Sequence, residues 1–397
     1  MALLQLGAKS YTALAFASRV AWALVAFYLV VVLSPDEFGR YSFAQITAGL
    51  AMQVVIGVLP NLLSSRMARS GLQASSRLLL IATLYAAVVA SLLSVVGALT
   101  DILQLTNFGP TTLLAIGAWI FGSFVAAIQV GYALAFGQYG RAALVGLLQP
   151  GLYLALILGL HTSNGELVAL YAALAAGLPA LFFLGITVAT NRSPREPALH
   201  TLREVLHDHR DSVGLNLAAI PTAVALWLML NLLSVGDPVQ LARYGLANQM
   251  FGLFLFLPAA LAGVAIPRLT RGDRAYRTRA TWLMAGGFLA ISVLAGAASL
   301  LVVVLPFVPA LLVDSRYEIA IALITGGFFA ARSPLAWINQ IDRNRTAETL
   351  ALLAHAAVLF SFVVLPPDSV LAFAVRLAAA IVSLSLSFWL VRQQARP

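Results

Sequence analysis

Residues 34–45 read Ser-Pro-Asp-Glu-Phe-Gly-Arg-Tyr-Ser-Phe-Ala-Gln, a short charged turn between two long apolar runs. A related stretch, Gly-Asp-Pro-Val-Gln-Leu-Ala-Arg-Tyr-Gly-Leu-Ala-Asn-Gln, occupies residues 236–249. Each copy has an acidic residue and a proline in the turn, followed by Arg-Tyr-x-x-Ala at the head of the next predicted helix. Weak internal similarity of this kind is typical of transporter folds built from structural repeats. The chain is therefore predicted to consist of two related halves.

The composition is that of a polytopic membrane protein. Of the 397 residues, 61% are hydrophobic and only 10% are charged, whereas soluble domains carry about 25% charged residues. The apolar runs are continuous and about 20 residues long, which suits membrane-spanning helices and not the alternating strands of a barrel. The sequence contains no cysteine, which excludes disulfides and thiolate metal sites.

The breaks between the apolar runs predict twelve spanning helices and hence an all-α fold. Their expected positions are about residues 10–33, 41–64, 78–99, 111–136, 142–160, 167–189, 212–235, 242–266, 280–304, 318–338, 347–365 and 370–391.

Six spans in each half give a simple domain organisation. We expect an N-terminal six-helix lobe at residues 1–190, a cytoplasmic linker at 191–211 and a C-terminal six-helix lobe at 212–397. Because six is an even number, both halves enter the membrane from the same side and should form parallel repeats around a central cavity. Within the linker, residues 199–206 form an amphipathic segment that is expected to lie on the membrane surface.

The basic residues are distributed unevenly between the two sides. Lys9 and most arginines outside the spans fall on one set of connections, and only Arg40, Arg243 and Arg316 fall on the other. Cytoplasmic loops are enriched in Lys and Arg, so both termini are predicted to be cytoplasmic. The same loops explain the net charge of +9. No basic stripe is interleaved with aromatic residues, so no nucleic acid partner is predicted.

Three arginines fall inside predicted spans: Arg19 in the first, Arg332 in the tenth and Arg376 in the twelfth. An arginine near the bilayer centre costs about 2.5–3.5 kcal/mol, so such residues usually face a bundle interior or a wet cavity. The alternative is snorkelling to the membrane surface, which suits Arg332 and Arg376 better because both lie near a span end. All acidic residues fall in loops or at span ends. A cavity with arginines and no acids suits an anion, because guanidinium contacts phosphate in a planar, bidentate way.

Amide side chains are the other polar groups at depth. Gln45, Asn216 and Asn248 are candidates to line the cavity, because they fall on the first or second predicted helix of a half. The alternative role is hydrogen bonding between helices, worth about 0.6 kcal/mol on average. No catalytic constellation, metal-ligand spacing or nucleotide-binding loop occurs. No catalytic residue, metal or cofactor is therefore predicted, and the chain is expected not to be an enzyme.

The residues quoted so far resemble a known family. A first span with an arginine followed by residues 33–41, together with residues 131–141, 243–249 and 265–269, is similar to the polysaccharide-exporting (Wzx-type) branch of the multidrug/oligosaccharidyl-lipid/polysaccharide (MOP) exporter superfamily. The resemblance extends over both halves and rests on short motifs. It implies a MATE-like bundle of twelve helices, six per lobe.

The resemblance also implies a substrate and its partners. The substrate would be an undecaprenyl-diphosphate-linked oligosaccharide repeat unit, flipped across the bacterial inner membrane for O-antigen or exopolysaccharide biosynthesis. Basic cavity residues of such proteins are thought to hold the diphosphate or acidic sugars, and the resemblance gives this role to Arg19. The chain lacks the extra helices of lipid II flippases, so lipid II is a poorer candidate. We expect a monomer surrounded by membrane lipid that associates with a polysaccharide polymerase or glycosyltransferases.

Three alternatives remain open. A multidrug or organic-cation antiporter of the same superfamily would need an acid at mid-membrane depth, and the sequence has none there. A major-facilitator transporter would also have six plus six spans, but its charged signature is missing from residues 64–71. A membrane glycosyltransferase or polymerase usually carries large outer loops, whereas the outer connections here are short.

Overall fold

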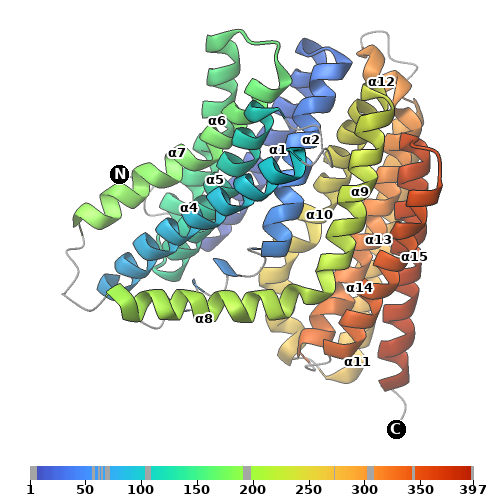
Figure 1. Cartoon of the computed structure of the whole chain (residues 1–397). Helices are drawn as coiled ribbons and strands as arrows, with labels where there is room; N and C mark the ends of the chain where they lie inside the picture. Colours follow the sequence, from blue (N-terminus) through green and yellow to red (C-terminus); the bar gives the residue numbers. More distant parts are fainter. Residues whose placement is uncertain are drawn as a thin grey trace. The chain divides into compact units, whose positions relative to one another are not determined.

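The computed structural model describes residues 7–55, 59–60, 63, 66–67, 72–102, 109–190, 198–271, 273–301, 308–341 and 345–394. Figure 1 shows that this part of the chain is helical, and no strand occurs within it. Nine helical segments among these residues are long and apolar enough to cross a membrane. The prediction of an all-α polytopic membrane protein is thus confirmed.

The nine candidate spans lie on α1 (Ala8–Val32), α4 (Leu72–Ile102), α5 (Pro110–Ala135), α6 (Tyr139–Leu160), α7 (Gly165–Thr190), α11 (Arg274–Leu300), α13 (Arg316–Ile341), α14 (Arg345–Phe360) with η4 (Ser361–Val364), and α15 (Ser369–Gln394). The other three predicted spans fall on α2 (Pro35–Val55), α9 (Ile220–Gly236) and α10 (Pro238–Arg271), of which α9 is apolar but shorter. A five-residue helix, α12 (Ala310–Asp314), precedes α13.

The two related turns begin their helices in the same way. Pro35 is the first residue of α2 and Pro238 is the first residue of α10. Proline suits this position because the first N–H groups of a helix have no partner within it. Asp237 adds a cap, since its Oδ1 accepts a hydrogen bond from the Val239 N–H at 2.9 Å. Both helices therefore begin several residues before the spans predicted at 41–64 and 242–266.

The Arg-Tyr pair of each motif also has a repeated role. Tyr41 and Tyr244 are each 1% exposed. The preceding arginines reach acids at a helix end, with Arg40 lying 3.9 Å from Glu166 and Arg243 lying 3.9 Å from Asp314. In both copies the tyrosine thus packs inward while the arginine forms a long ion pair.

The described helices form two compact units. Unit 1 comprises residues 1–33 and 40–217, and unit 2 comprises residues 34–39 and 218–397. In unit 1, α1 packs against α6, α4 against α5, and α5 against α7. In unit 2, α9 packs against α14, α11 against α13, and α13 against α15. Counted from the first long helix of each unit, these are the same pairings, so helix packing repeats as the sequence motif does.

Glycines allow these helices to approach closely. A Cβ atom added at Gly122 of α5 would lie 2.8 Å from the Ala173 carbonyl oxygen of α7. A Cβ atom added at Gly326 of α13 would lie 2.7 Å from the Cβ of Phe254 on α10. Real Cβ atoms do not approach other atoms so closely, so these crossings require glycine.

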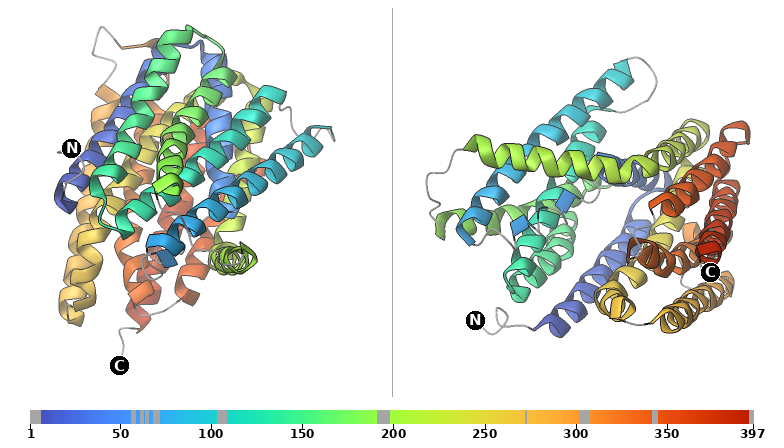
Figure 2. Two further views of the ribbon diagram at one scale, coloured as in Figure 1. Left: turned by 90° about the vertical axis from the view of Figure 1, so that its left-hand side faces the viewer. Right: turned by 90° about the horizontal axis from the view of Figure 1, so that it is seen from below.

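A further helix, α8 (Ala198–Asn216), belongs to unit 1 and packs against α4. It runs across one end of that unit and is seen end-on in the left view of Figure 2. Residues 191–197 of the predicted linker lie outside the described residues.

Helix α8 corrects the predicted seventh span. It continues through Asn216, is followed by a 3₁₀ turn, η2 (Leu217–Ala219), and only then does α9 begin at Ile220. The predicted start at residue 212 is wrong because the last turn of an amphipathic helix runs directly into an apolar one, without a charged break between them. Asn216 therefore lies on α8 and not on the first spanning helix of unit 2.

Candidate functional site

Arg19 lies deep within an apolar helix and its side chain is exposed. It follows Ser10, where the 23-residue span begins, by nine residues, which is about 14 Å along the helix axis. Thr12 and Phe16 lie on the same side of α1 and are also exposed. Arg19 is thus an exposed residue at a depth where an arginine facing lipid would be costly.

Contacts with α6 fix the orientation of α1. Ser18 donates a hydrogen bond to the Gly146 carbonyl oxygen at 2.7 Å. One turn later, the rings of Trp22 and Tyr153 lie 5.2 Å apart. Because Ser18 and Trp22 hold one side of α1 against α6, the neighbouring Arg19 is kept at the edge of this packed face.

Gln45 lies on α2, four residues after the buried Tyr41, and its side chain is partly buried. Residues four apart share one face of a helix. Gln45 therefore lies on the same face of α2 as Tyr41, whose ring lies 6.3 Å from that of Trp119 on α5.

Two predicted site residues, Arg376 and Asn248, meet inside unit 2. Arg376 of α15 is 4% exposed. Its Nη1 donates hydrogen bonds to Asn248 Oδ1 at 2.8 Å and to the Tyr244 hydroxyl at 3.0 Å, both on α10. Its guanidinium carbon lies 4.3 Å from the centroid of the Phe251 ring and 5.0 Å from that of Phe373. The charge is thus surrounded by acceptors and aromatic faces.

Arg332 of α13 is also buried, and it forms an ion pair with Glu348 of α14. His355 of α14 is buried as well. Its ring contacts that of Phe329 at 4.9 Å, and Phe329 contacts Phe251 at 5.4 Å. The interior of unit 2 therefore contains the buried side chains of Arg332, His355 and Arg376.

The predicted site residues have different surroundings. Arg332, Arg376 and Asn248 make contacts between helices inside unit 2, whereas Arg19 is accessible on α1. The side chain of Asn216 lies outside the part of the chain that the structure describes, so its assignment to the site stays a prediction.

The sequence interpretation missed a partner for Arg141. It was expected in a connection, but it lies in the first turn of α6 and its guanidinium donates to the Phe183 carbonyl oxygen and to the Thr187 hydroxyl of α7. The same guanidinium lies 5.2 Å from the Phe183 ring centroid. Nothing local in the sequence identifies these partners, because they lie more than a whole helix away along the chain.

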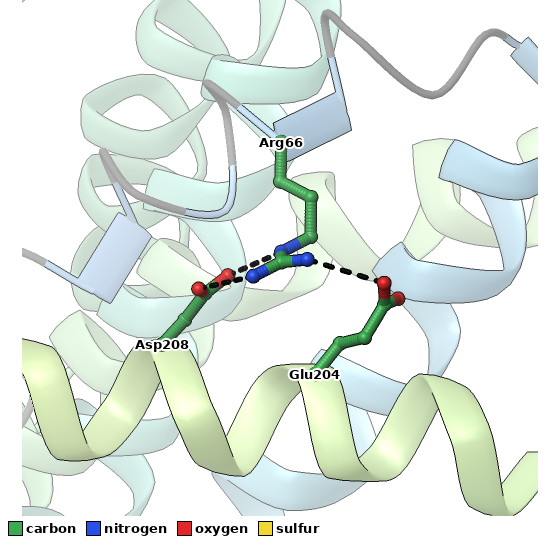
Figure 3. Close-up of polar contacts among 3 residues, drawn as sticks. All are labelled: Arg66, Glu204 and Asp208. Atoms are coloured by element: carbon green, nitrogen blue, oxygen red, sulfur yellow. Dashed lines mark hydrogen bonds and ion pairs between the residues drawn. The ribbon is translucent and has the colours of Figure 1, made fainter.

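Arg66 forms a second unforeseen contact, with the linker helix (Figure 3). Its Nε and Nη2 donate to the two carboxylate oxygens of Asp208 at 2.7 and 2.6 Å, and its Nη1 donates to Glu204 Oε1 at 3.1 Å. Asp208 and Glu204 are four residues apart and so share one face of α8. The hydrogen bonds to Asp208 raise the pKa of Arg66, against the opposing effect of burial. This bidentate contact fastens α8 to the rest of unit 1.

The described residues contain no group of three or more His, Asp or Glu side chains that could hold a metal ion. The predicted site residues offer guanidinium and amide groups, with aromatic rings beside Arg376. These groups bind and orient anions and polar ligands through hydrogen bonds and stacking.

Comparison with protein-family models and with curated proteins found no match. Solved structures do match. The lipid II flippase MurJ in an inward closed conformation is similar with a TM-score of 0.75 at 10% identity, over 97% of this chain and 88% of that one. An inward-facing multidrug resistance MATE family transporter of the MOP superfamily is similar with a TM-score of 0.56 at 14% identity, over 98% of this chain and 96% of that one.

An outward-facing MATE family transporter gives a TM-score of 0.51 at 13% identity, over 99% of this chain and 97% of that one. These structural similarities establish a common fold. At such low sequence identities they do not by themselves show that the substrate is shared. The chain has the fold that the MurJ flippase and the MATE transporters of the MOP superfamily share.

Proposed function

We propose that this protein is a flippase that moves an undecaprenyl-diphosphate-linked oligosaccharide repeat unit across the bacterial inner membrane, for O-antigen or exopolysaccharide biosynthesis. It works by alternating access, while the lipid tail stays in the bilayer. The fold supports this proposal, because one protein of the same fold is described as a lipid II flippase.

The observation that carries the proposal is the position of Arg19, an exposed residue in the middle of an apolar helix. An arginine at this depth usually faces a bundle interior or a water-filled cavity. A diphosphate offers oxygens that match the planar donors of guanidinium. We assign the substrate diphosphate to Arg19, and we propose Gln45, Asn216, Asn248, Arg332 and Arg376 as further substrate-binding residues.

The location and partners follow from the same proposal. The basic connections and both termini lie in the cytoplasm, as the distribution of Lys and Arg supports. The chain acts as a monomer and passes its product to a polysaccharide polymerase. It performs no covalent chemistry on the substrate.

A multidrug antiporter is the second candidate, and the fold shared with the MATE transporters favours it. Deletion of the gene distinguishes the two. Extraction of undecaprenyl-diphosphate lipids from the deletion strain should give completed repeat units that remain in the cytoplasmic leaflet. Completed units that reach the periplasm without being polymerised would instead indicate a polymerase. Unchanged lipids together with a new sensitivity to organic cations would support the antiporter.

Arg19 is tested in the reconstituted protein. Arg19→Ala should insert normally in liposomes but lose translocation of a fluorescent polyprenyl-diphosphate disaccharide, and Arg19→Lys should keep part of it because one charge remains without the planar fork. Arg279→Ala is the matched control, because Arg279 is exposed at the basic end of α11. Full translocation by a well-folded Arg19→Ala protein would remove Arg19 from the site.

A further inference from the structure

Three kinds of residue follow separate stripes along helix α8. Positions three, four or seven residues apart share one face of a helix. At these spacings lie the acids Glu204, Asp208 and Asp211, the basic residues His200, Arg203, His207 and Arg210, and the leucines Leu199, Leu202 and Leu206. Helix α8 therefore has an acidic, a basic and an apolar face.

The acidic face is turned towards the rest of unit 1. Figure 3 shows Glu204 and Asp208 pointing from α8 to Arg66, which donates hydrogen bonds to both carboxylates. Thr201 and Val205 lie on the same side of α8 as Asp208, and all three are buried. Both acids are thus held against the protein by one arginine.

The basic and apolar faces are exposed. Their described residues form the outer face of α8, which consists of Leu202, Arg203, Leu206, His207 and Arg210. Leu202 is 36% exposed and Leu206 is 47% exposed. Arg203 and Arg210 form no hydrogen bond or ion pair within the part of the chain that the structure describes. Because Glu204 and Asp208 point inward, the outer face presents basic charge beside leucine side chains.

Contacts with α4 place this helix at the level of the membrane. The ring of His209 on α8 lies 5.3 Å from that of Tyr85 on α4. Tyr85 lies inside the candidate span Ser76–Leu99. Helix α8 itself is too polar to be a candidate span, and it runs across one end of unit 1 (Figure 1). It therefore lies where α4 enters the bilayer, with its outer face turned away from Arg66.

The outer face has the two properties that a lipid headgroup layer selects. A helix that lies at this boundary carries leucines on the side of the acyl chains and arginines on the side of the headgroups. Guanidinium groups donate in pairs to phosphate oxygens, and each basic residue adds attraction to an anionic surface. A water-exposed helix would gain nothing from Leu202 and Leu206 beside this charge. The charge complementarity favours an anionic lipid.

We propose that the outer face of α8 binds anionic phospholipid in the leaflet next to the basic connections. Arg203 and Arg210 contact the headgroup phosphates, and Leu202 and Leu206 reach into the start of the acyl layer. The lipid and Arg66 then hold α8 from opposite sides. The proposal concerns lipid binding by the linker helix, and it goes beyond the proposed flippase activity without depending on it.

The test uses the purified full-length protein with a nitroxide at Leu206→Cys, since the chain has no cysteine of its own. It is placed in nanodiscs of phosphatidylcholine, with or without phosphatidylglycerol. Dissolved oxygen is enriched in the bilayer and a nickel chelate stays in water, so the ratio of their effects on the label measures its depth. Phosphatidylglycerol should raise the oxygen-to-nickel ratio, and added salt should reverse this rise because salt screens the charges.

Arginine variants test the role of charge. Arg203→Gln combined with Arg210→Gln should lose the effect of phosphatidylglycerol, and the corresponding lysine variants should retain part of it. Arg279→Gln is the matched control, because Arg279 is exposed on α11 and not on α8. It should respond to phosphatidylglycerol as the labelled parent does. Should the double glutamine variant fail to fold, the salt dependence of the labelled parent decides the question.

Three results would overturn the proposal. The label could be equally open to the nickel chelate in both nanodiscs, which would leave the outer face in water. It could be equally immersed in both, which would mean that anionic charge has no part in binding. It could be protected only in native membranes and not in nanodiscs, which would indicate a protein partner in place of lipid.

Discussion

Arginines within apolar helices illustrate how differently one residue type can be used. Arg376 is buried among Tyr244, Asn248 and two phenylalanine rings, whereas Arg19 is accessible at a comparable depth in the sequence pattern. The cost of placing a guanidinium in an apolar environment is offset in the first case by internal acceptors. Arg376 therefore has a structural task, whatever further part it plays in transport.

This difference leads to a prediction about stability. Arg376→Ala should lower the thermal stability of the protein in detergent, because the Asn248 amide and the Tyr244 hydroxyl would lose a charged hydrogen-bond partner. The expected loss is about 1.5–3 kcal/mol. Arg279→Ala should be neutral, because its side chain is exposed. An Arg376→Ala protein that is fully stable but inactive would instead give Arg376 a role in substrate binding alone.

The partners of these arginines could not be predicted from the sequence. Arg376 and its two acceptors are separated by 132 and 128 positions, and Arg66 and Asp208 by 142. The hydropathy pattern predicts the depth of each of these residues in the membrane. To predict a hydrogen bond, one must also know which helices pack together and how each helix is rotated about its own axis. For this reason the sequence can propose candidate residues, but it could not predict that Arg332 and Arg376 are buried while Arg19 is exposed.

Helices, in contrast, were largely predictable, because their apolar length and their turns are local properties. Pro35 and Pro238 mark the first residues of α2 and α10, where proline is favoured. The error at Asn216 has the same local origin. The amphipathic helix α8 ends in residues without charge. The hydropathy pattern joins these residues to the next helix, α9.

Close packing at glycines gives a prediction at the scale of helix pairs. Gly122→Ala should destabilise unit 1, because the new Cβ would meet the backbone of α7 at 2.8 Å from the Ala173 oxygen and 2.9 Å from the Gly177 nitrogen. Overpacking of this kind typically costs about 1–3 kcal/mol. Gly185→Ala on α7 is the control, because nothing lies within 4 Å of its added Cβ. Thermal melting of both variants should show a loss only for Gly122→Ala.

Docking of α8 on α4 should depend on pH. His209 packs against Tyr85, with ring centroids 5.3 Å apart, and burial lowers the pKa of His209 from its ordinary value of 6.5. Protonation is therefore less favourable when α8 is docked than when it is free. Neutral His209 therefore stabilises the docked position of α8 fully above pH 6.5. This contribution is lost as the pH falls through the lowered pKa of His209.

A spin label on Leu206→Cys, at an exposed position of α8, can measure this dependence. Its mobility should rise as the pH falls from about 8 to about 5. His209→Phe keeps the ring contact with Tyr85 and should abolish the change. Equal mobility of the wild-type label at both pH values would contradict the prediction.

At the scale of the whole molecule, the duplication links sequence and packing. The Arg-Tyr motif recurs at the head of α2 and α10, and the helix pairings of unit 1 recur in unit 2. Chemistry does not recur to the same extent. Unit 2 contains the buried Arg332, His355, Arg376 and Glu318, whereas unit 1 contains the exposed Arg19 and the Arg66 contact. The two units have kept a packing scheme while their polar groups diverged.

The orientation in the membrane can be tested on the intact chain, which has no cysteine of its own. Single cysteines are placed at Ser163, between α6 and α7, and at Ala275, at the basic end of α11; both positions are exposed. Because cytoplasmic loops retain Lys and Arg, a membrane-impermeant maleimide added to intact spheroplasts should label Ser163→Cys and not Ala275→Cys. After lysis both should be labelled. The reverse pattern would place the basic connections outside the cell, and it would contradict the direction of transport proposed for the lipid-linked oligosaccharide.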